Sequence, residues 1–386
     1  MSSTSKHWLR TLLVSSTITQ AVIYILRPMI TYRALELDAS PTTVGIIAAV
    51  YALLPVLTAL IFGRWVGVLG EGRFVIFGTA GLVISSVALL YANSIPLLAL
   101  AASISGLAHL ACMVGGQTMV SLKSVQNKYE ENFGYYTFSA SLGQMVGPII
   151  GAIVAGSTGI IPTSTANAFL AALVLALIAL IPIIQWRNDN PTVVGVRKEE
   201  GTLKSAGKLL RNKKVFAAIY TSMAISSVGD ILLVFLPLYG TENSFSSFSI
   251  GVIIAIRAGA SMLSRLSLGA LSARYSTKEI LIVSNVISVA TFSVMGFAPN
   301  AFVLGALVLL AGFSLGVGQP LTMSLVSLAT QPEERAMAVS ARLTGNRLGQ
   351  FLIPAGAGLL ATSAGTGGVF IGLAVLLAST FIPRQG

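Results

Sequence analysis

Charged residues are scarce in this chain of 386 residues, since Asp, Glu, Lys and Arg together make up 10% of it. Soluble domains carry about 25% charged residues, so the composition excludes an ordinary soluble protein. Cys112 is the single cysteine, which excludes an intramolecular disulfide and a cysteine-rich metal site. The sequence contains no G-x-x-x-x-G-K-[ST] loop for ATP. We expect neither a metal nor a cofactor.

Hydrophobic residues make up 54% of the chain, and the mean hydropathy is +0.84. The apolar runs are about 20 residues long, the length of a helix that spans a bilayer. They do not alternate apolar and polar residues, as the strands of an outer-membrane barrel do. We therefore expect an all-α polytopic membrane protein with twelve transmembrane helices. The predicted spans are 11–31, 44–63, 74–92, 97–120, 133–156, 165–186, 215–239, 248–268, 279–298, 300–328, 336–361 and 367–383.

The second half of the sequence repeats the first at an offset of 206 residues, the distance from Gly45 to Gly251. The same offset relates Leu142-Gly143-Gln144 with Pro148 to Leu348-Gly349-Gln350 with Pro354. A register that holds over many segments indicates duplication of a whole six-helix half. We predict an N-terminal six-helix domain at 1–186, a cytoplasmic linker at 187–214 and a C-terminal six-helix domain at 215–386.

The basic residues fall in loops on one side of the membrane under this topology, with Arg33 as the exception. Loops rich in Lys and Arg stay in the cytoplasm, so both termini are predicted to be cytoplasmic. The first apolar run is long and lacks a cleavage site, so it is expected to be a membrane helix. A basic face toward anionic headgroups explains the net charge of +11 without nucleic acid. We expect a monomer in the cell (inner) membrane.

The predicted fifth helix contains Gly143, Gly147, Pro148 and Gly151, which form a G-x-x-x-G-P-x-x-G motif. The glycines allow a neighbouring helix to approach closely, while Pro148 removes a backbone donor. This motif, in the fifth of twelve helices, resembles the antiporter motif of the major facilitator superfamily, in its drug:proton antiporter branch. The resemblance implies two six-helix domains that rock around a central site, with the motif at the interface that opens and closes.

The loop between the second and third predicted helices is a less faithful match to the superfamily. Gly63, Gly70 and Arg73 are similar to its pattern, but Gly67 stands where an aspartate is expected. The equivalent position of the second half also lacks an acid. The missing acids argue against the charge relay of the relatives, and leave Gly63 and Arg73 as candidates for a conformational role.

Ionisable side chains inside membrane helices are costly, and by default they indicate function. Arg257 and Arg347 fall near the middle of their predicted helices, whereas Arg27 and Arg342 fall in the outer and inner halves of theirs. Against these four arginines the predicted spans contain one acid, Asp230. An excess of guanidinium groups attracts carboxylates or phosphates and repels cations. For Arg27 and Arg342, snorkelling toward the headgroups or capping of backbone carbonyls is an equal alternative.

Asp230 is the predicted site of proton coupling. Burial favours the protonated form of a carboxylate and a nearby arginine favours the charged form, so a group that alternates between them can carry a proton. Our hypothesis is that charged Asp230 pairs with Arg257 or Arg347, and that protonation releases the arginine for an anionic substrate. A permanent structural ion pair is the alternative. His109 is a second candidate for the relay, against the alternative of a merely hydrogen-bonded histidine.

Polar and aromatic side chains complete the predicted substrate path, on helices that resemble the cavity-lining ones of the superfamily. These candidates are Tyr24, Tyr51, Gln144, Asn346 and Gln350, with Gln20, Gln117, Tyr136 and Tyr220 beside them. Gln144 and Gln350 are favoured because they occupy equivalent positions of the repeat, each beside a glycine.

The sequence predicts a secondary active transporter that exports a small anionic or zwitterionic organic compound in a proton-coupled manner, by alternating access. Proton-coupled uptake of an organic anion and broad multidrug export are the alternatives. Gly312–Gly316 spells the G-x-S-x-G of hydrolases, but it lies in an apolar helix rather than at a strand-to-helix turn, so no enzyme activity is expected. A sensor or scaffold would carry an appended soluble domain, and the longest polar stretch is the linker.

Overall fold

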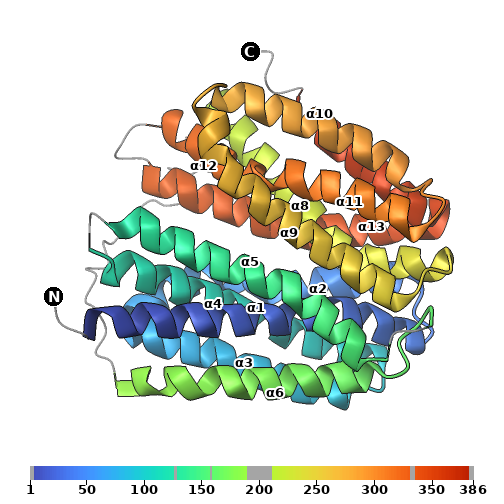
Figure 1. Ribbon diagram of the computed structural model, residues 1–386, viewed down its shortest axis with the longest axis horizontal. Helices are drawn as coiled ribbons and strands as arrows, with labels where there is room; N and C mark the ends of the chain where they lie inside the picture. The colour runs from blue at the N-terminus through green and yellow to red at the C-terminus, as the bar shows by residue number, and fades with distance from the viewer. Residues whose placement is uncertain (1–3, 126–127, 157–158, 189–210, 331–334, 382–386) are drawn as a thin grey trace. The chain divides into compact units, whose positions relative to one another are not determined.

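The computed structural model describes residues 4–125, 128–156, 159–188, 211–330 and 335–381, which form helices joined by short connections (Figure 1). The first half contains α1 (Thr4–Glu36), α2 (Pro41–Leu69), α3 (Glu71–Leu90), α4 (Ile95–Lys123), α5 (Tyr129–Val154), α6 (Thr165–Ile183) and a 3₁₀ helix, η2 (Ile184–Asn188). The second half contains α8 (Lys213–Glu242), α9 (Ser247–Ser272), α10 (Thr277–Met295), α11 (Ala301–Gly316), α12 (Gly318–Leu328) and α13 (Arg335–Ser379). The all-α prediction is confirmed. Most of the predicted linker lies outside the described residues.

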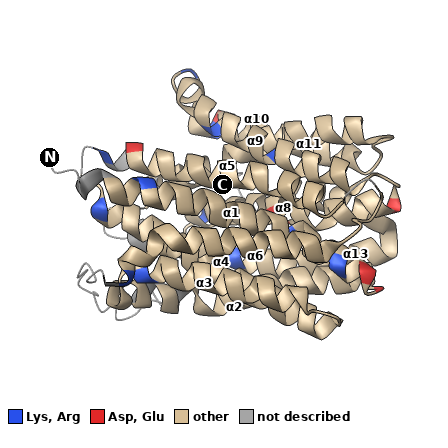
Figure 2. Cartoon of the chain, turned by 60° about the horizontal axis from the view of Figure 1, so that its bottom comes forward, with Lys and Arg blue, Asp and Glu red and all other residues tan. Residues whose placement is uncertain are grey.

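Among the described residues, eleven segments are long and apolar enough to cross a membrane. The last of them, Ala341–Ser379, contains Gly365, whose φ of 69° and ψ of 172° interrupt α13 and divide it into two arms. With these arms counted separately, the segments correspond to the twelve predicted helices. The tenth predicted helix differs in one respect, because a break at Val317 separates α11 from α12. Most of the helical ribbon carries no charged residue (Figure 2).

Polar side chains satisfy the backbone donors at several helix starts. Asn212 accepts hydrogen bonds at the start of α8, and Asn300 does so at the start of α11. Ser276 and Glu279 form a reciprocal capping box at the start of α10. Because the first N–H groups of a helix have no partner within it, such caps fix where each helix begins.

Two glutamates, Glu36 and Glu242, have equivalent roles at the ends of α1 and α8. Glu36 Oε2 accepts a hydrogen bond from Thr165 Oγ1, the first residue of α6, at 2.9 Å. Glu242 Oε2 accepts from the backbone N–H of Thr366 at 3.2 Å and also from its hydroxyl, at the start of the second arm of α13. A carboxylate is favourable at a helix N-terminus. The first and sixth helices of each half are thus joined by the same device.

The chain forms two compact units. Unit 1 consists of Met1–Ala39, Val50–Val196 and Ser246–Ala255, and unit 2 of Ser40–Ala49, Arg197–Phe245 and Ile256–Gly386. Each half therefore contributes the start of its second helix to the other unit. These exchanged segments, 40–49 and 246–255, are related by the same 206-residue offset as the sequence repeat.

Each exchanged segment packs through one glycine. A Cβ atom at Gly45 would lie 2.6 Å from the carbonyl oxygen of Pro354 in unit 2. A Cβ atom at Gly251 would lie 3.0 Å from the carbonyl oxygen of Pro148 in unit 1. Both contacts require the absence of a side chain, and they relate equivalent residues. The repeat seen in the sequence is therefore repeated in the packing.

In unit 1, α1 packs along α5 and α6. The motif glycines of α5 face α1: Gly143 lies against the carbonyl oxygen of Thr17, Gly147 against Ala21 and Gly151 against Ile25. The contacts on α1 are four residues apart and so lie on one helix face. The predicted close approach at this motif is present, and its partner in unit 1 is α1.

Replacing Gly147 by Ala is expected to destabilise the protein, because the new Cβ would lie 2.5 Å from the carbonyl oxygen of Ala21. Overpacking of this kind costs about 1–3 kcal/mol. Gly134→Ala, in the same helix, is the matched control, since nothing lies within 4 Å of a Cβ there. The melting temperature of the purified protein in detergent should fall for Gly147→Ala and stay equal or rise for Gly134→Ala. Equal values for the two variants would contradict the close packing of α1 on α5.

Candidate functional site

In unit 1, four helices contribute to one network of polar side chains. Tyr51 Oη of α2 is 2.9 Å from His109 Nδ1 of α4. His109 Nε2 is 3.4 Å from the amide nitrogen of Gln20, on α1. Gln144 of α5 donates to Gln20 Oε1 at 3.3 Å. The structure therefore brings together four of the residues predicted for this half: Tyr51, His109, Gln144 and Gln20, which links the other three.

Arg27 extends this network through an aromatic contact. Its guanidinium carbon lies 4.7 Å from the centroid of the Tyr51 ring. Cation–π contacts of this kind hold a guanidinium without neutralising it. Arg27 and Tyr24, both on α1, are buried. The arginine is thus packed on an aromatic ring within unit 1.

Tyr51 and Arg257 occupy equivalent positions of the repeat, and their backbones make the same contact. Gly106 of α4 lies against the Tyr51 carbonyl oxygen, and Gly312 of α11 lies against the Arg257 carbonyl oxygen. The glycines of the G-x-S-x-G sequence at 312–316 therefore serve helix packing. The two halves share a scaffold here and differ in the side chain that it presents.

In unit 2, the polar contacts follow α8. Arg347 donates to Gln350 Oε1 at 2.9 Å, and Gln350 donates to Ser226 Oγ of α8 at 3.0 Å. One turn further on, Nη1 of Arg257 lies 3.6 Å from the Cβ position of Gly229. Asp230 is the next residue of α8. Arg257 thus lies beside α8 at the residue before the acid, and Arg347 is linked to α8 through Gln350.

A third arginine, Arg342 of α13, is bound to the start of α12. Its Nη2 donates to Gln319 Oε1 at 2.6 Å and to the Gln319 backbone carbonyl at 2.9 Å. Asn346 Nδ2 also donates to Gln319 Oε1, at 3.3 Å. The Gln319 amide in turn donates to the Ser222 carbonyl of α8 at 3.2 Å. Gln319 therefore joins α8, α12 and α13, a role that the sequence analysis missed.

Glu71 is a second residue that the sequence analysis missed. It begins α3 directly after Gly70, is only 3% exposed, and forms an ion pair with Lys123 at 3.6 Å. Arg73, from the same loop motif, donates to the Arg187 carbonyl at 2.8 Å. The acid that the superfamily pattern lacks at Gly67 is thus present four residues later, and it is paired within unit 1. Gly63, the first glycine of the motif, lies within α2.

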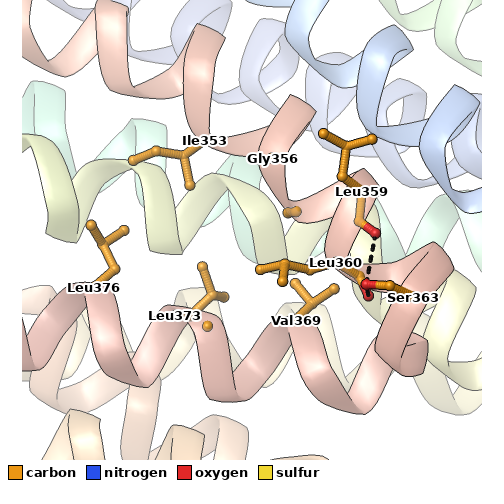
Figure 3. A pocket seen from close by; sticks show the side chains of 10 residues that line it. Ile353, Gly356, Leu359, Leu360, Ser363, Val369, Leu373 and Leu376 are labelled. Carbon is orange, nitrogen blue, oxygen red and sulfur yellow. Dashed lines mark hydrogen bonds between the residues drawn. The ribbon is translucent and has the colours of Figure 1, made fainter.

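The pocket in Figure 3 has a volume of about 510 Å³ and lies between the two arms of α13. Ile353, Leu359 and Leu360 line it from the first arm, and Leu373 and Leu376 from the second. The hydroxyl of Ser363, which belongs to the same lining, is hydrogen-bonded to backbone carbonyls of its own helix. This lining includes none of the predicted site residues and suits an apolar occupant. Within the described part of the chain, no cluster of three or more His, Cys, Asp or Glu could hold a metal ion.

Several known proteins are similar to this chain. A relative from Lactococcus lactis subsp. lactis (strain IL1403), the multi-drug resistance efflux pump PmrA homolog, is 27% identical over 56% of this chain and 53% of its own length. The tetracycline resistance protein, class B, of Escherichia coli is 23% identical over 75% of this chain and 72% of its own length. The match thus spans about half the length of the first relative and nearly three quarters of the second.

Solved structures agree in fold over nearly the whole chain. A crystal structure of nucleoside transporter NupG has a TM-score of 0.77 at 16% identity, covering 98% of this chain and 99% of the other. A POT family transporter in complex with a thioalcohol-conjugated peptide has a TM-score of 0.79 at 16% identity, covering 97% and 94%. At these identities the likeness concerns the fold.

Repeated halves of membrane-spanning helices, with polar clusters inside each unit, define a multi-pass membrane carrier. The model of the Major Facilitator Superfamily matches residues 12–275 and 230–383, and the chain belongs to this family. It is therefore a secondary transporter of the membrane and not an enzyme. Its distant relatives include a multi-drug resistance efflux pump homolog and a tetracycline resistance protein.

Two substitutions of Tyr51 separate the contacts in unit 1. Tyr51→Phe keeps the ring beside Arg27 and removes the hydroxyl bonded to His109, whereas Tyr51→Leu removes both. Since a cation–π contact is worth about 0.5–2 kcal/mol, the melting temperature in detergent should fall more for Leu than for Phe. Equal losses would show that the ring does not stabilise Arg27.

Proposed function

We propose that this chain exports a small anionic or zwitterionic organic compound in exchange for protons, by alternating access of two six-helix domains at 1–186 and 215–386. We infer that 187–214 links them in the cytoplasm, where both termini lie. The protein acts as a monomer in the inner membrane.

The observation that carries this proposal is the approach of two arginines to α8 beside Asp230. Arg347 reaches α8 through Gln350 at Ser226, and Arg257 lies beside Gly229. Guanidinium groups bind carboxylates and phosphates through paired hydrogen bonds. An acid next to them competes with an anionic substrate for the same donors.

This competition provides a coupling mechanism. When Asp230 is charged, it holds an arginine and excludes the substrate; when Asp230 binds a proton, the arginine is available to the anion. Proton and anion therefore favour the same state of one site, so that binding of one promotes binding of the other. Coupling of this sign moves the proton and the anion together, as the uptake alternative requires.

Unit 1 contains a network of polar side chains and one further cation. His109 shares hydrogen bonds with Tyr51 and Gln20, and Gln144 extends the chain of amides. Arg27, held beside Tyr51, adds positive charge to the substrate path. Protonation of His109 would add to it, so we assign this residue a secondary role in coupling. The motif glycines of α5, with Gly63 and Arg73, support the conformational change.

Two alternative functions predict different transport of protons and substrate. Proton-coupled uptake uses the same positive site and reverses the direction of coupling. Broad multidrug export is favoured by the names of the relatives, one a multi-drug efflux pump and the other a tetracycline resistance protein. A net positive site disfavours cationic drugs.

Proton movement in proteoliposomes that contain a pH dye tests these possibilities. Organic anions and cations of matched size are added outside, with protein-free liposomes as the control for passive permeation. Antiport of an anion should make the lumen more alkaline, whereas symport should make it more acidic. A response to lipophilic cations alone would instead identify a multidrug exporter.

Asp230→Asn is expected to fold normally and to abolish the proton response, because the amide cannot carry the proton. Glu131→Gln, which neutralises an exposed acid at the start of α5, is the matched control and should behave as wild type. An unchanged proton response in Asp230→Asn would contradict the role of Asp230.

A further inference from the structure

Arg342 is a buried cation with neutral partners. Its side chain belongs to a residue that is 5% exposed. In the described part of the chain its donors contact Gln319, the hydroxyl of Thr322 and the sulfur of Met323. A buried charge is stabilised best by an opposite charge, and these contacts supply none.

The side chain of Gln319 makes the contacts that a polar ligand would make at this arginine. Its oxygen accepts from Arg342 at 2.6 Å and from Asn346 at 3.3 Å. Its nitrogen donates to the Ser222 carbonyl at 3.2 Å. A group that replaced it would need an acceptor oxygen with an N–H donor close by.

Two buried atoms of the same cluster make no hydrogen bond in the structure: Nε of Arg342, a donor, and Oδ1 of Asn346, an acceptor. Both residues are on α13, four positions apart, and so lie on the same helix face. Buried polar atoms are nearly always hydrogen-bonded in proteins. The cluster thus retains one donor and one acceptor for a ligand that carries both kinds of group.

We propose that Arg342, Asn346 and the Ser222 carbonyl recognise an organic acid with an N–H group next to its carboxylate, and that Gln319 occupies this site until such a substrate displaces it. The class includes amino acids and their N-acyl derivatives. This inference rests on the proposed function and narrows its substrate class. It adds Arg342 to the arginines that recognise the anion, while Arg257 and Arg347 keep the role in coupling with Asp230.

Two substitutions of Gln319 separate this role from a purely structural one. Gln319→Glu supplies the missing negative charge, so it should raise the melting temperature of the unliganded protein and weaken binding of the acids at least about tenfold. Gln319→Met removes the internal competitor, so it should lower the melting temperature and leave binding equal or tighter. Gln185→Glu makes the same chemical change at an exposed residue and should alter neither quantity.

Binding is measured as the ligand-induced rise in melting temperature of the purified full chain in detergent, without a proton gradient. The probes are phenylalanine, N-acetylphenylalanine, phenylalanine amide and 3-phenylpropanoate, with the corresponding leucine-derived set. The first two compounds should stabilise wild type more than the amide, which lacks the anion, and more than 3-phenylpropanoate, which lacks the N–H. Asn346→Leu should remove the preference over 3-phenylpropanoate, and Arg342→Gln the preference over the amide.

The proposal is overturned if acids without an N–H bind equally well, or if no acid of either set binds. It is also overturned if, in both Gln319 variants, ligand affinity changes in the same direction as the melting temperature of the unliganded protein. These outcomes are separable from failure of the proposed function. A protein that binds the N–H acids but moves no protons would refute the coupling through Asp230 and retain the recognition site. Proton movement with acids that lack an N–H would support coupling and refute the recognition proposed here.

Discussion

A peptide group inside a bilayer has no water to bind, so each backbone donor and acceptor must find its partner within the protein. This constraint makes the chain helical, and it then leaves little hydrophobic driving force to bring the helices together, because lipid tails are as apolar as leucine side chains. Close contact has to come from small residues. Gly143 and Gly147 let α5 approach the α1 backbone, and Gly106 and Gly312 repeat the principle in the two halves.

The bilayer also makes a buried charge costly, so each buried charged group needs a partner inside the protein. Three buried charged groups are held in different ways: Glu71 by Lys123, Arg27 beside the ring of Tyr51, and Arg342 by the neutral side chain of Gln319. An ion pair leaves little affinity for a third charge, whereas a neutral amide satisfies donors of a guanidinium and leaves its charge in place. Under the proposals above, this difference separates structural charges from those that bind an anion.

The duplicated halves share a scaffold and differ in chemistry. Glu36 and Glu242 accept hydrogen bonds from the start of the sixth helix of each half, and Gly45 and Gly251 pack on equivalent prolines. At one shared position the first half has Tyr51 and the second Arg257, on backbones that make the same contact. Close helix packing restricts which residues are tolerated, because it brings backbone atoms into contact. A side chain that projects away from such a contact can be replaced without disturbing the packing. The first half therefore holds a polar network around His109, and the second holds the deep arginines.

Length and hydropathy of the apolar runs were sufficient to predict the helices, because spanning a bilayer requires a fixed length of helix. The break at Val317 was missed, although Gly316, Gly318 and Pro320 beside it are residues that interrupt helices. The repeat and the motif in α5 indicated the family, and the charges identified Asp230, Arg257 and Arg347 as candidates. The hydrogen-bond partners of the buried charges could not be predicted. Gln319 holds Arg342 and Lys123 pairs with Glu71, and in each pair the two residues are far apart in the chain.

The sequence by itself determined which segments enter the membrane and which side chains are costly there, because both depend on local composition. Only the tertiary structure decided which partner meets each charge, because that depends on how the helices rotate and pack.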